Sequence, residues 1–474
     1  MTRIDERVST HVYKVKRISK EEMESIAGVC VYDQSPFCNA ACPLKLDVKA
    51  MLKAAAENDF KKAFKIYESI APFPLILSAG CGAPCEEKCR LCELGDGIAI
   101  GDIERAVALS GGAGEKRSIF RVRKKKKAAV FGSGLFALLL AGELEKKGYP
   151  VTAICGEADE EEYLRVAAGF LREDDFYTEL KRLRGKDIAF EFNAEMTREL
   201  FEEKRGGFDV LCASEKAALD IFPGAVRDEG IMLMESEGLL TGGGETVLEA
   251  ALGARKAALT ADRLAQGIDP RSARGEEGPV TSRLYTNPDL ARGLIRIKGC
   301  ESGYTREQAA EEAGRCMQCH CDECLRGCAY LRRFNKHPGL LSREIYNNTQ
   351  IIMGDHPLNR AMNACALCGQ CTVTCPHGFD MAHVCRTARE NMVDTDKMPL
   401  AAHEFALLDM LFSNGEAYLC RKQPGHSHCR YVFFPGCQAA AIAPEAVIAA
   451  YEDLCTRLKG GVALMLGCCG AIAH

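Results

Sequence analysis

The most informative stretch of this chain places four cysteines at short, regular intervals. They are Cys365, Cys368 and Cys371, followed by Cys375, which directly precedes Pro376. Thiolates at three-residue intervals wrap one face of a [4Fe–4S] cubane, and the cysteine before the proline usually ligates a neighbouring cluster. We therefore expect iron–sulfur chemistry and one-electron transfer. A structural zinc site is the alternative, because paired Cys-x-x-Cys sequences also suit zinc.

An upstream group of cysteines supplies the ligands that a neighbouring cluster needs, so the two groups together predict a helical, dicluster module of the ferredoxin type. One predicted cluster is held by Cys365, Cys368, Cys371 and Cys328. The other is held by Cys375, Cys321, Cys324 and either Cys316 or Cys319. Regular spacing would put a ligand at Gln318, so the choice within this doublet stays open. Cys385 is predicted to be a buried thiol.

The composition suits a soluble chain of several domains. The 474 residues include 27% charged and 47% hydrophobic residues, with a net charge of −5, so nothing overall suggests nucleic acid. The 26 cysteines are the anomaly. They fall in short clusters on a chain whose start lacks an apolar signal segment, which favours metal over disulfides and predicts a cytoplasmic protein. The longest apolar run, 128–141, is too short to span a bilayer.

Two more cysteine groups lie near the N-terminus, and helices must bring them together. Residues 47–70 carry apolar side chains at helical spacing between the two groups, which predicts one or two helices. The cysteines of the two groups are Cys30, Cys38, Cys42, Cys81, Cys85, Cys89 and Cys92.

These spaced motifs, with Glu104 in the run 98–105, resemble the N-terminal domain of the glutamate synthase small subunit, which also begins dihydropyrimidine dehydrogenase. The resemblance covers about residues 20–110 and implies a helical domain with two [4Fe–4S] clusters. It implies that one cluster is held by Cys42, Cys81, Cys85 and Glu104. It implies that the other is held by Cys30, Asp33, Cys38 and Cys89.

Asp33 departs from the pattern of that family, which has cysteine at this position. A carboxylate is a harder ligand for iron than a thiolate. The alternatives are an Asp-ligated cluster, a three-iron species, or a cluster completed by Cys92.

A dinucleotide-binding motif follows a basic run at 121–127. The run is interpreted as a solvated linker, with a docking patch for an acidic redox partner as the alternative. Gly132 and Gly134 then fit the turn that lets a pyrophosphate approach the N-terminus of a helix beginning near Leu135. The acid expected on the ribose is displaced, because Cys155 ends the second strand and Glu157 comes two residues later. A Rossmann half without nucleotide is the alternative.

The segment 241–266 resembles the end of the FAD domain of the glutamate synthase family, with Gly243 and Gly244 where a Gly-Asp pair is usual. Only about 25 residues separate the strand near 209–213 from residue 238. A nicotinamide-binding domain of about a hundred residues would be needed there. The resemblance therefore argues against direct oxidation of NAD(P)H by this chain.

The C-terminal part carries Cys437 after a Pro-Gly turn and the pair Cys468–Cys469 before a glycine. These motifs resemble the Cys-rich domain of heterodisulfide reductase catalytic subunits, which implies a further, non-cubane cluster. A later Cys-x-x-Cys of that family has no counterpart before residue 474, so we expect a truncated domain.

Together these features predict a multidomain α and α/β protein, with no catalytic residues assigned. We expect an anaerobic iron–sulfur flavoprotein oxidoreductase subunit that uses about four [4Fe–4S] clusters and FAD and meets a redox partner protein. A non-enzymatic carrier with a vestigial flavin domain, and an NAD(P)H-dependent enzyme of the glutamate synthase type, are the alternatives. The predicted domains are a helical iron–sulfur domain at 1–115, a reduced Rossmann-like FAD domain at 116–275, a helical dicluster ferredoxin domain at 276–415 and the start of a Cys-rich α/β domain at 416–474.

Overall fold

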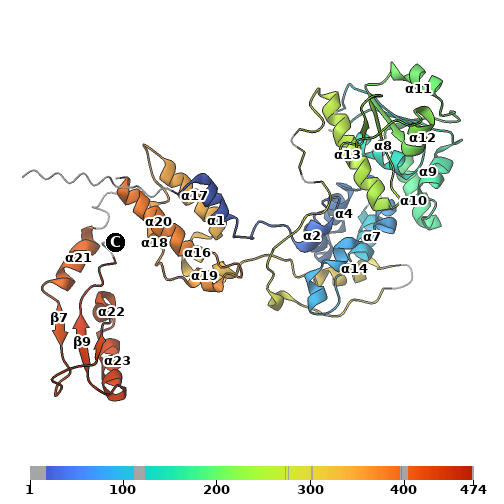
Figure 1. The fold of residues 1–474 in the computed structure, drawn as a ribbon. Helices are drawn as coiled ribbons and strands as arrows, with labels where there is room; N and C mark the ends of the chain where they lie inside the picture. Colours follow the sequence, from blue (N-terminus) through green and yellow to red (C-terminus); the bar gives the residue numbers. More distant parts are fainter. Residues whose placement is uncertain are drawn as a thin grey trace, which may run out of the picture. The chain divides into compact units, whose positions relative to one another are not determined.

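The computed structural model describes residues 18–111, 123–272, 274–275, 277–299, 303–395, 397 and 404–471. The chain divides into two compact units (Figure 1). One unit is Val31–Asp322, and the other combines Met1–Cys30 with Glu323–His474. The division falls within the predicted dicluster domain, between Cys321 and Cys324. The mixed helical and α/β class is confirmed, and the individual domain boundaries stay predictions.

Short helices form the first part of the unit Val31–Asp322. Asp47 caps α3 by accepting from the amide of Ala50 at 3.0 Å, and Asp59 caps α4 by accepting from Lys62 at 3.0 Å. Helices α3 and α4 occupy the stretch 47–70, where one or two helices were predicted, and α5 follows before Cys81. The helices of this part are α2 (Phe37–Ala41), α3 (Val48–Ala56), α4 (Phe60–Glu68), α5 (Pro74–Gly80), α6 (Pro84–Glu87), the 3₁₀ helix η1 (Arg90–Glu93) and α7 (Ile100–Gly111).

A six-stranded sheet forms the second part of this unit, with strand order β3-β2-β1-β4-β6-β5. All neighbouring strands are parallel except β5 and β6. The predicted strand–turn–helix is present as β1 followed by α8, and the predicted second strand is β2. The strands are β1 (Ala128–Phe131), β2 (Val151–Ile154), β3 (Ile188–Glu191), β4 (Val210–Ser214), β5 (Leu233–Met234) and β6 (Leu239–Gly242).

Helices cover the sheet and join it to the helical part. Helix α8 is buried on all sides from Phe136 to Glu145, because it packs against the sheet as well as α13. The two parts are also linked through buried acids: Asp175 binds Arg105 at 2.8 Å, and Glu179 accepts from the amide of Leu75 at 2.6 Å. The helices are α8 (Leu135–Lys146), α9 (Glu160–Ala168), α10 (Glu173–Arg184), α11 (Arg198–Arg205), α12 (Glu215–Ile221) and α13 (Val247–Ala265).

After the sheet, the chain returns to the helical part. This return segment, residues 277–322, contains the 3₁₀ helix η2 (Pro288–Leu290) and α14 (Arg306–Gly314), which packs against α3 and α7. Helix α14 begins at a capping box formed by Thr305 and Gln308.

Buried Glu312 in α14 holds the return segment against the helical part. Its carboxylate accepts hydrogen bonds from the amides of Ala99 at 3.0 Å and Ile297 at 2.9 Å. It also pairs with buried Arg315 at 2.6 Å, and Arg315 in turn donates to the carbonyl of Asp96 at 2.6 Å. One charged pair therefore ties α14 to the start of α7.

The other unit contains the described N-terminal helix and the dicluster segment. Helix α1 packs against α17, and Arg343 pairs with Glu24 at 3.0 Å. Cys385 in α20 is fully buried, as predicted. The helices are α1 (Lys20–Ala27), α15 (Glu323–Gly327), α16 (Ala329–Phe334), α17 (Pro338–Gln350), α18 (Asn359–Ala364), α19 (Gln370–Thr374) and α20 (Met381–Asp394).

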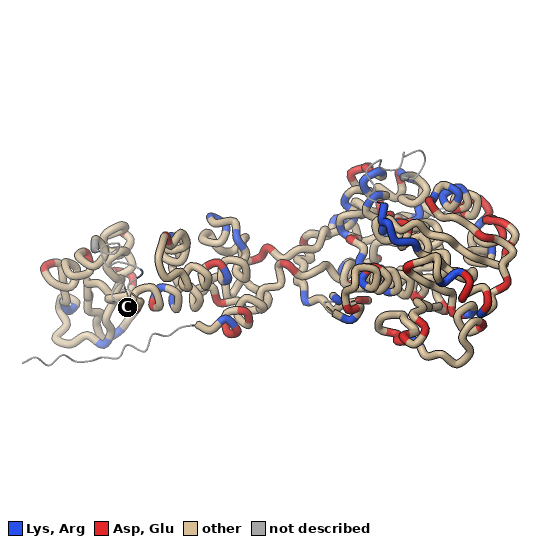
Figure 2. Tube along the Cα trace, turned by 90° about the horizontal axis from the view of Figure 1, so that it is seen from above, with Lys and Arg blue, Asp and Glu red and all other residues tan. Residues whose placement is uncertain are grey.

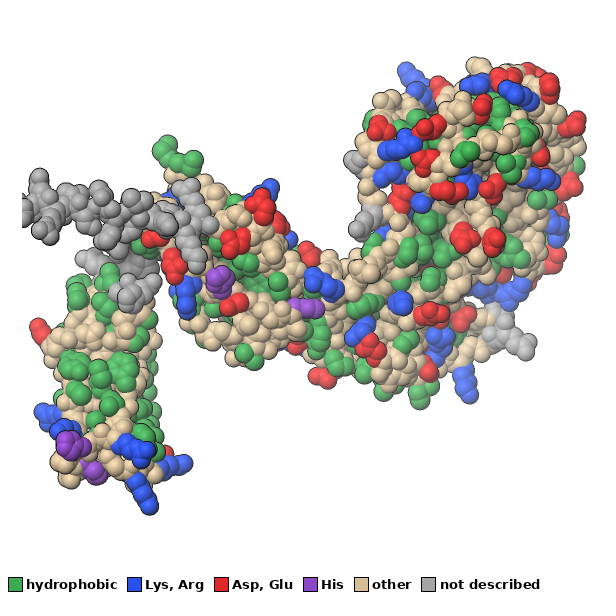
Figure 3. All heavy atoms as spheres, in the orientation of Figure 1, with side chains coloured by type: hydrophobic (Ala, Val, Ile, Leu, Met, Phe, Trp, Pro, Cys, Tyr) green, Lys and Arg blue, Asp and Glu red, His purple; other side chains and the backbone are tan. Residues whose placement is uncertain are grey.

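The last part of the chain forms a three-stranded sheet of order β7-β9-β8, in which β8 and β9 are parallel. Hydrophobic side chains are widely exposed here (Figure 3), and they include Phe405 and Ile442, which are 85% and 81% exposed. The elements are α21 (Glu404–Asn414), β7 (Leu419–Arg421), β8 (Tyr431–Phe433), α22 (Cys437–Ile442), α23 (Pro444–Arg457) and β9 (Val462–Leu466).

Replacing Glu312 by alanine is expected to destabilise the unit Val31–Asp322 by about 3–5 kcal/mol, because Arg315 would keep a buried, uncompensated charge. Denaturant unfolding followed by circular dichroism measures the shift. Glu311→Ala is the matched control, since Glu311 is exposed on the same helix. Equal effects of the two substitutions would contradict the role assigned to Glu312.

Candidate iron–sulfur and nucleotide sites

The helical part brings the first predicted N-terminal ligand set together. Cys42 follows α2, Cys81 follows α5, Cys85 lies in α6 and Glu104 lies in α7. Burial raises the pKa of Glu104 to about 8. Burial, and then Glu104, raise the pKa of Cys81 and Cys85.

Three thiols and a buried carboxyl therefore interact within one apolar core, where Glu104 is only 4% exposed. Buried acidic groups of this kind are usually paired with a cation or bound to a metal. The donor set thus fits an iron–sulfur cluster.

Two members of the second predicted N-terminal set lie at one cavity. Cys38 and Cys89 line one cavity together, but the other two cysteines of that cavity are Cys316 and Cys319. Asp33 is exposed and does not line the cavity.

Cys30 belongs to the other compact unit, where it packs against α17. Cys92, the cysteine considered as a replacement ligand, is exposed and donates to the carbonyl of Glu86 at 3.4 Å.

One predicted dicluster set lines a single cavity in the other unit. Cys328, Cys365, Cys368 and Cys371 all contribute to its wall, and its volume is about 410 Å³. Cys328 caps α16, Cys365 ends α18, and Cys371 lies in α19. Four thiols around one enclosed space match the ligand requirement of a [4Fe–4S] cluster.

The remaining predicted dicluster ligands fall on both sides of the division between the units. Cys321 lies in the unit Val31–Asp322. Cys324 and Cys375 contact the same hydrophobic core of the other unit, Cys324 from α15 and Cys375 at the end of α19.

Cys385 has a role that the sequence did not suggest. Its thiol forms a hydrogen bond with Cys365, which lowers the pKa of Cys365 to about 6, while the pKa of Cys385 is raised. The sulfur of Cys385 also lies 3.7 Å from the hydroxyl of Tyr330. Because thiolates ligate metal, this contact favours the ligating form of Cys365. The two cysteines are twenty positions apart in the sequence and no short spacing motif connects them, so nothing in the sequence indicated the pairing.

The C-terminal part places two of its three predicted ligands together. Cys437 begins α22 after the turn at Gly436, and its thiol forms a hydrogen bond with Cys468, which follows β9. Cys469 is exposed.

The predicted dinucleotide turn has the required backbone. Gly132 and Gly134 have φ angles of 84° and 98°, which favour glycine, and α8 begins at Leu135. A Cβ at Gly134 would meet no atom within 4 Å, so the approach to the helix N-terminus is open. Beyond β2, the Oε2 atom of Glu157 is buried without a hydrogen-bond partner in the described chain. A ribose hydroxyl is a suitable donor for such an oxygen, so the adenosine half of FAD fits these residues.

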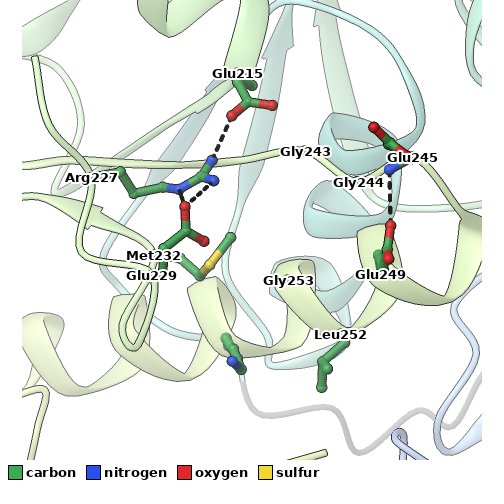
Figure 4. Close-up of a pocket in the computed structure, with 11 residues that line it drawn as sticks. Glu215, Arg227, Glu229, Met232, Gly243, Gly244, Glu245, Glu249, Leu252 and Gly253 are labelled. Atoms are coloured by element: carbon green, nitrogen blue, oxygen red, sulfur yellow. Dashed lines mark hydrogen bonds and ion pairs between the residues drawn. The ribbon is translucent and has the colours of Figure 1, made fainter.

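Gly243 and Gly244 lie at a different cavity, between β6 and α13, with a volume of about 460 Å³ (Figure 4). Glutamates surround it, and its Arg227 already binds Glu215 at 3.1 Å and Glu229 at 2.6 Å. The N-terminus of α13 is satisfied by a capping box of Thr246 and Glu249. This acidic, self-paired lining does not fit a phosphate. The cofactor contacts of the two glycines stay a prediction. The remaining lining residues are Met232, Glu245, Leu252, Gly253 and Lys256.

The described part of the basic run is anchored to the sheet domain. Lys124 binds Asp262 of α13, and Lys126 donates to the carbonyl of Ala265. Basic and acidic residues are interspersed along the trace of this unit (Figure 2). The described part of the run, 123–127, is thus attached to α13. This attachment favours neither a solvated linker nor a docking patch.

Among the described residues, no group of three or more His, Cys, Asp or Glu is arranged tightly enough for a single metal ion, and the described cysteines are free thiols. A cubane spreads its ligands around four irons, so its ligands stand farther apart than those of one ion. No helix in the described ranges has the length and apolar character of a membrane span.

Comparison with known proteins identifies the two cluster regions. Residues 7–112 match the family described as dihydropyrimidine dehydrogenase domain II, 4Fe-4S cluster, and residues 315–380 match the 4Fe-4S dicluster domain. The chain carries two iron–sulfur domains. These matches confirm two resemblances that the motifs indicated. One is to the glutamate synthase and dihydropyrimidine dehydrogenase domain, and the other is to the dicluster ferredoxins.

Curated relatives are oxidoreductase subunits. The chain is 28% identical over 230 residues to the NADPH-Fe(3+) oxidoreductase subunit beta of Geobacter sulfurreducens. The aligned region covers 46% of this chain and 33% of the relative. It is 28% identical over 159 residues to the NADP(+)-dependent formate dehydrogenase subunit beta of Moorella thermoacetica, covering 28% and 21%. It is 29% identical over 146 residues to the glutamate synthase [NADPH] small chain of Azospirillum brasilense, covering 28% and 29%.

Replacing Cys385 by alanine is expected to lower the reduction potential of the cluster bound by Cys365, because hydrogen bonds to the sulfurs raise cluster potentials. Redox titration followed by electron paramagnetic resonance measures the change. Cys212→Ala is the control, since Cys212 is equally buried but lies in β4. Unchanged potentials in Cys385→Ala would show that the hydrogen bond has no influence on the cluster.

Proposed function

We propose that this chain relays electrons through several [4Fe–4S] clusters as a subunit of a larger oxidoreductase. The observation that carries the proposal is the cavity lined by Cys328, Cys365, Cys368 and Cys371, a complete set of thiol ligands in one place. The relatives support it, because two of them are named as subunits of oxidoreductases.

The bound clusters would supply one-electron chemistry, and the protein holds and tunes them. Burial around Glu104 and the hydrogen bond from Cys385 set the local charge at two separate ligand sets. Cluster potentials respond to burial, charge and hydrogen bonding, so these features give the two clusters different potentials.

We also propose that the sheet domain binds FAD through its adenosine half. Gly134 leaves room for the pyrophosphate at α8, and Glu157 offers an unpaired oxygen to the ribose. The described residues between β4 and β6 contain only α12 and β5, too little for a second dinucleotide domain. Electrons are therefore proposed to enter through the clusters from a partner protein.

A heterodisulfide reductase-like terminal part is the finer form of the proposal. The contact between Cys437 and Cys468 supports it, because it joins two motifs that are about thirty residues apart in the chain. Cys469 would complete the thiol set. Zinc is the competing metal for every cysteine site, because the same ligands suit it.

The first test of the proposal is metal content. Anaerobic purification and reconstitution are expected to give about sixteen irons per chain, or about four clusters at full occupancy. Iron and sulfide analysis with an anaerobic absorption spectrum provides the count, and flavin released by denaturation is measured on the same sample. Zinc as the main metal, or fewer than about eight irons, would rule out the relay.

The second test concerns the entry of electrons. Stopped-flow mixing with NADH or NADPH alone is expected to leave clusters and flavin oxidised, because hydride transfer requires a domain that places the donor against the flavin. Dithionite or a reduced ferredoxin should bleach the same absorption bands. Rapid, saturable bleaching by either nicotinamide would overturn the proposed route and favour an enzyme of the glutamate synthase type.

A further inference from the structure

The cavity beside α2 collects four cysteines from three separate segments of the unit Val31–Asp322. Cys38 lies in α2, Cys89 directly precedes η1, and Cys316 and Cys319 follow α14. All four cysteines line this one cavity within a single unit.

The loop that carries Cys316 and Cys319 is firmly attached to the helical part. The side-chain amide of Gln318 donates to the sulfur of Cys316 at 3.3 Å and to the carbonyl of Lys49 in α3 at 3.2 Å. The ammonium group of Lys49 donates back to the carbonyl of Cys319 at 3.0 Å. Met317 between them is buried in the core of this unit. These contacts leave the two cysteines with little freedom to reach another site.

A buried hydroxyl supports the same arrangement. Thr286 is only 4% exposed and lies beside Cys319. Its hydroxyl oxygen is buried without a hydrogen-bond partner in the described chain.

One position that the resemblance implies for this cluster lies outside the cavity in this chain. Asp33 is exposed and does not line it. The return segment supplies two thiols to the cavity, those of Cys316 and Cys319.

We propose that Cys38, Cys89, Cys316 and Cys319 bind one [4Fe–4S] cluster. The inference rests on the iron–sulfur cofactor of the proposed function and specifies which residues hold one of its clusters. A cationic cluster core relieves the repulsion among four neighbouring thiolates, so the donor set fits it. The open volume between them is about 20 Å³, so binding must turn the cysteine side chains outward.

The test uses the full-length protein, reconstituted anaerobically with iron and sulfide. Cys38→Ser and the double variant Cys316→Ser/Cys319→Ser should each lose about four irons per chain, the content of one cluster. The triple variant should lose no more than either, because all three positions serve the same cluster. Asp33→Ala and Cys92→Ser are controls expected to keep the full iron content.

Several outcomes would overturn the assignment. A loss of about eight irons in the triple variant would place Cys38 and the doublet in different clusters. A loss of about four irons in Asp33→Ala would restore the ligand set of the family. Absence of iron from the wild type would instead refute the proposed function, so the two failures are distinguishable.

A measurement on the wild-type protein tests the same ligand set without any variant, in case the variants do not fold. The reconstituted protein is treated with ferricyanide, and newly exposed thiols are alkylated and identified by mass spectrometry over time. Cys38, Cys89, Cys316 and Cys319 should become reactive with one common rate constant. Release of Cys316 and Cys319 together with Cys324 and Cys375, at a rate different from Cys38, would contradict the proposal.

Discussion

A buried carboxylate needs hydrogen-bond donors or a cation beside it. In this chain two segments supply the amide donors that Glu312 requires. It accepts from the start of α7 and from residue 297 of its own segment, while pairing with Arg315. Desolvation makes any other position for this charge costly. The end of α14, and the cysteines that follow it by two and five residues, are therefore fixed against the helical iron–sulfur domain.

The same use of buried acids connects the helical part with the sheet. Asp175 and Glu179 of α10 reach Arg105 in α7 and the first turn of α5. Electron transfer between cofactors depends on their remaining at fixed positions, and a single packed core provides this. In contrast, the acidic cavity beside α13 is occupied by its own ion pairs and offers no comparable cofactor site (Figure 4).

Local patterns in the sequence predicted the local structure well. The glycine turn before α8 and the burial of Cys385 depend on nearby residues, and both are present. The partners of distant cysteines could not be predicted in the same way. Spacing assigned one of Cys316 and Cys319 to the dicluster set, whereas packing of α14 on α3 and α7 places both at the cavity that Cys38 and Cys89 line. Spacing reports which residues can share a site, whereas long-range packing decides which do.

Iron anomalous diffraction from crystals of the anaerobically reconstituted protein tests the central claim most directly. We predict a cluster-sized anomalous peak enclosed by the sulfurs of Cys38, Cys89, Cys316 and Cys319. A peak beside Cys38 and Cys89 that is completed by Cys30 or Asp33, with Cys316 and Cys319 bound to a different cluster, would contradict the account.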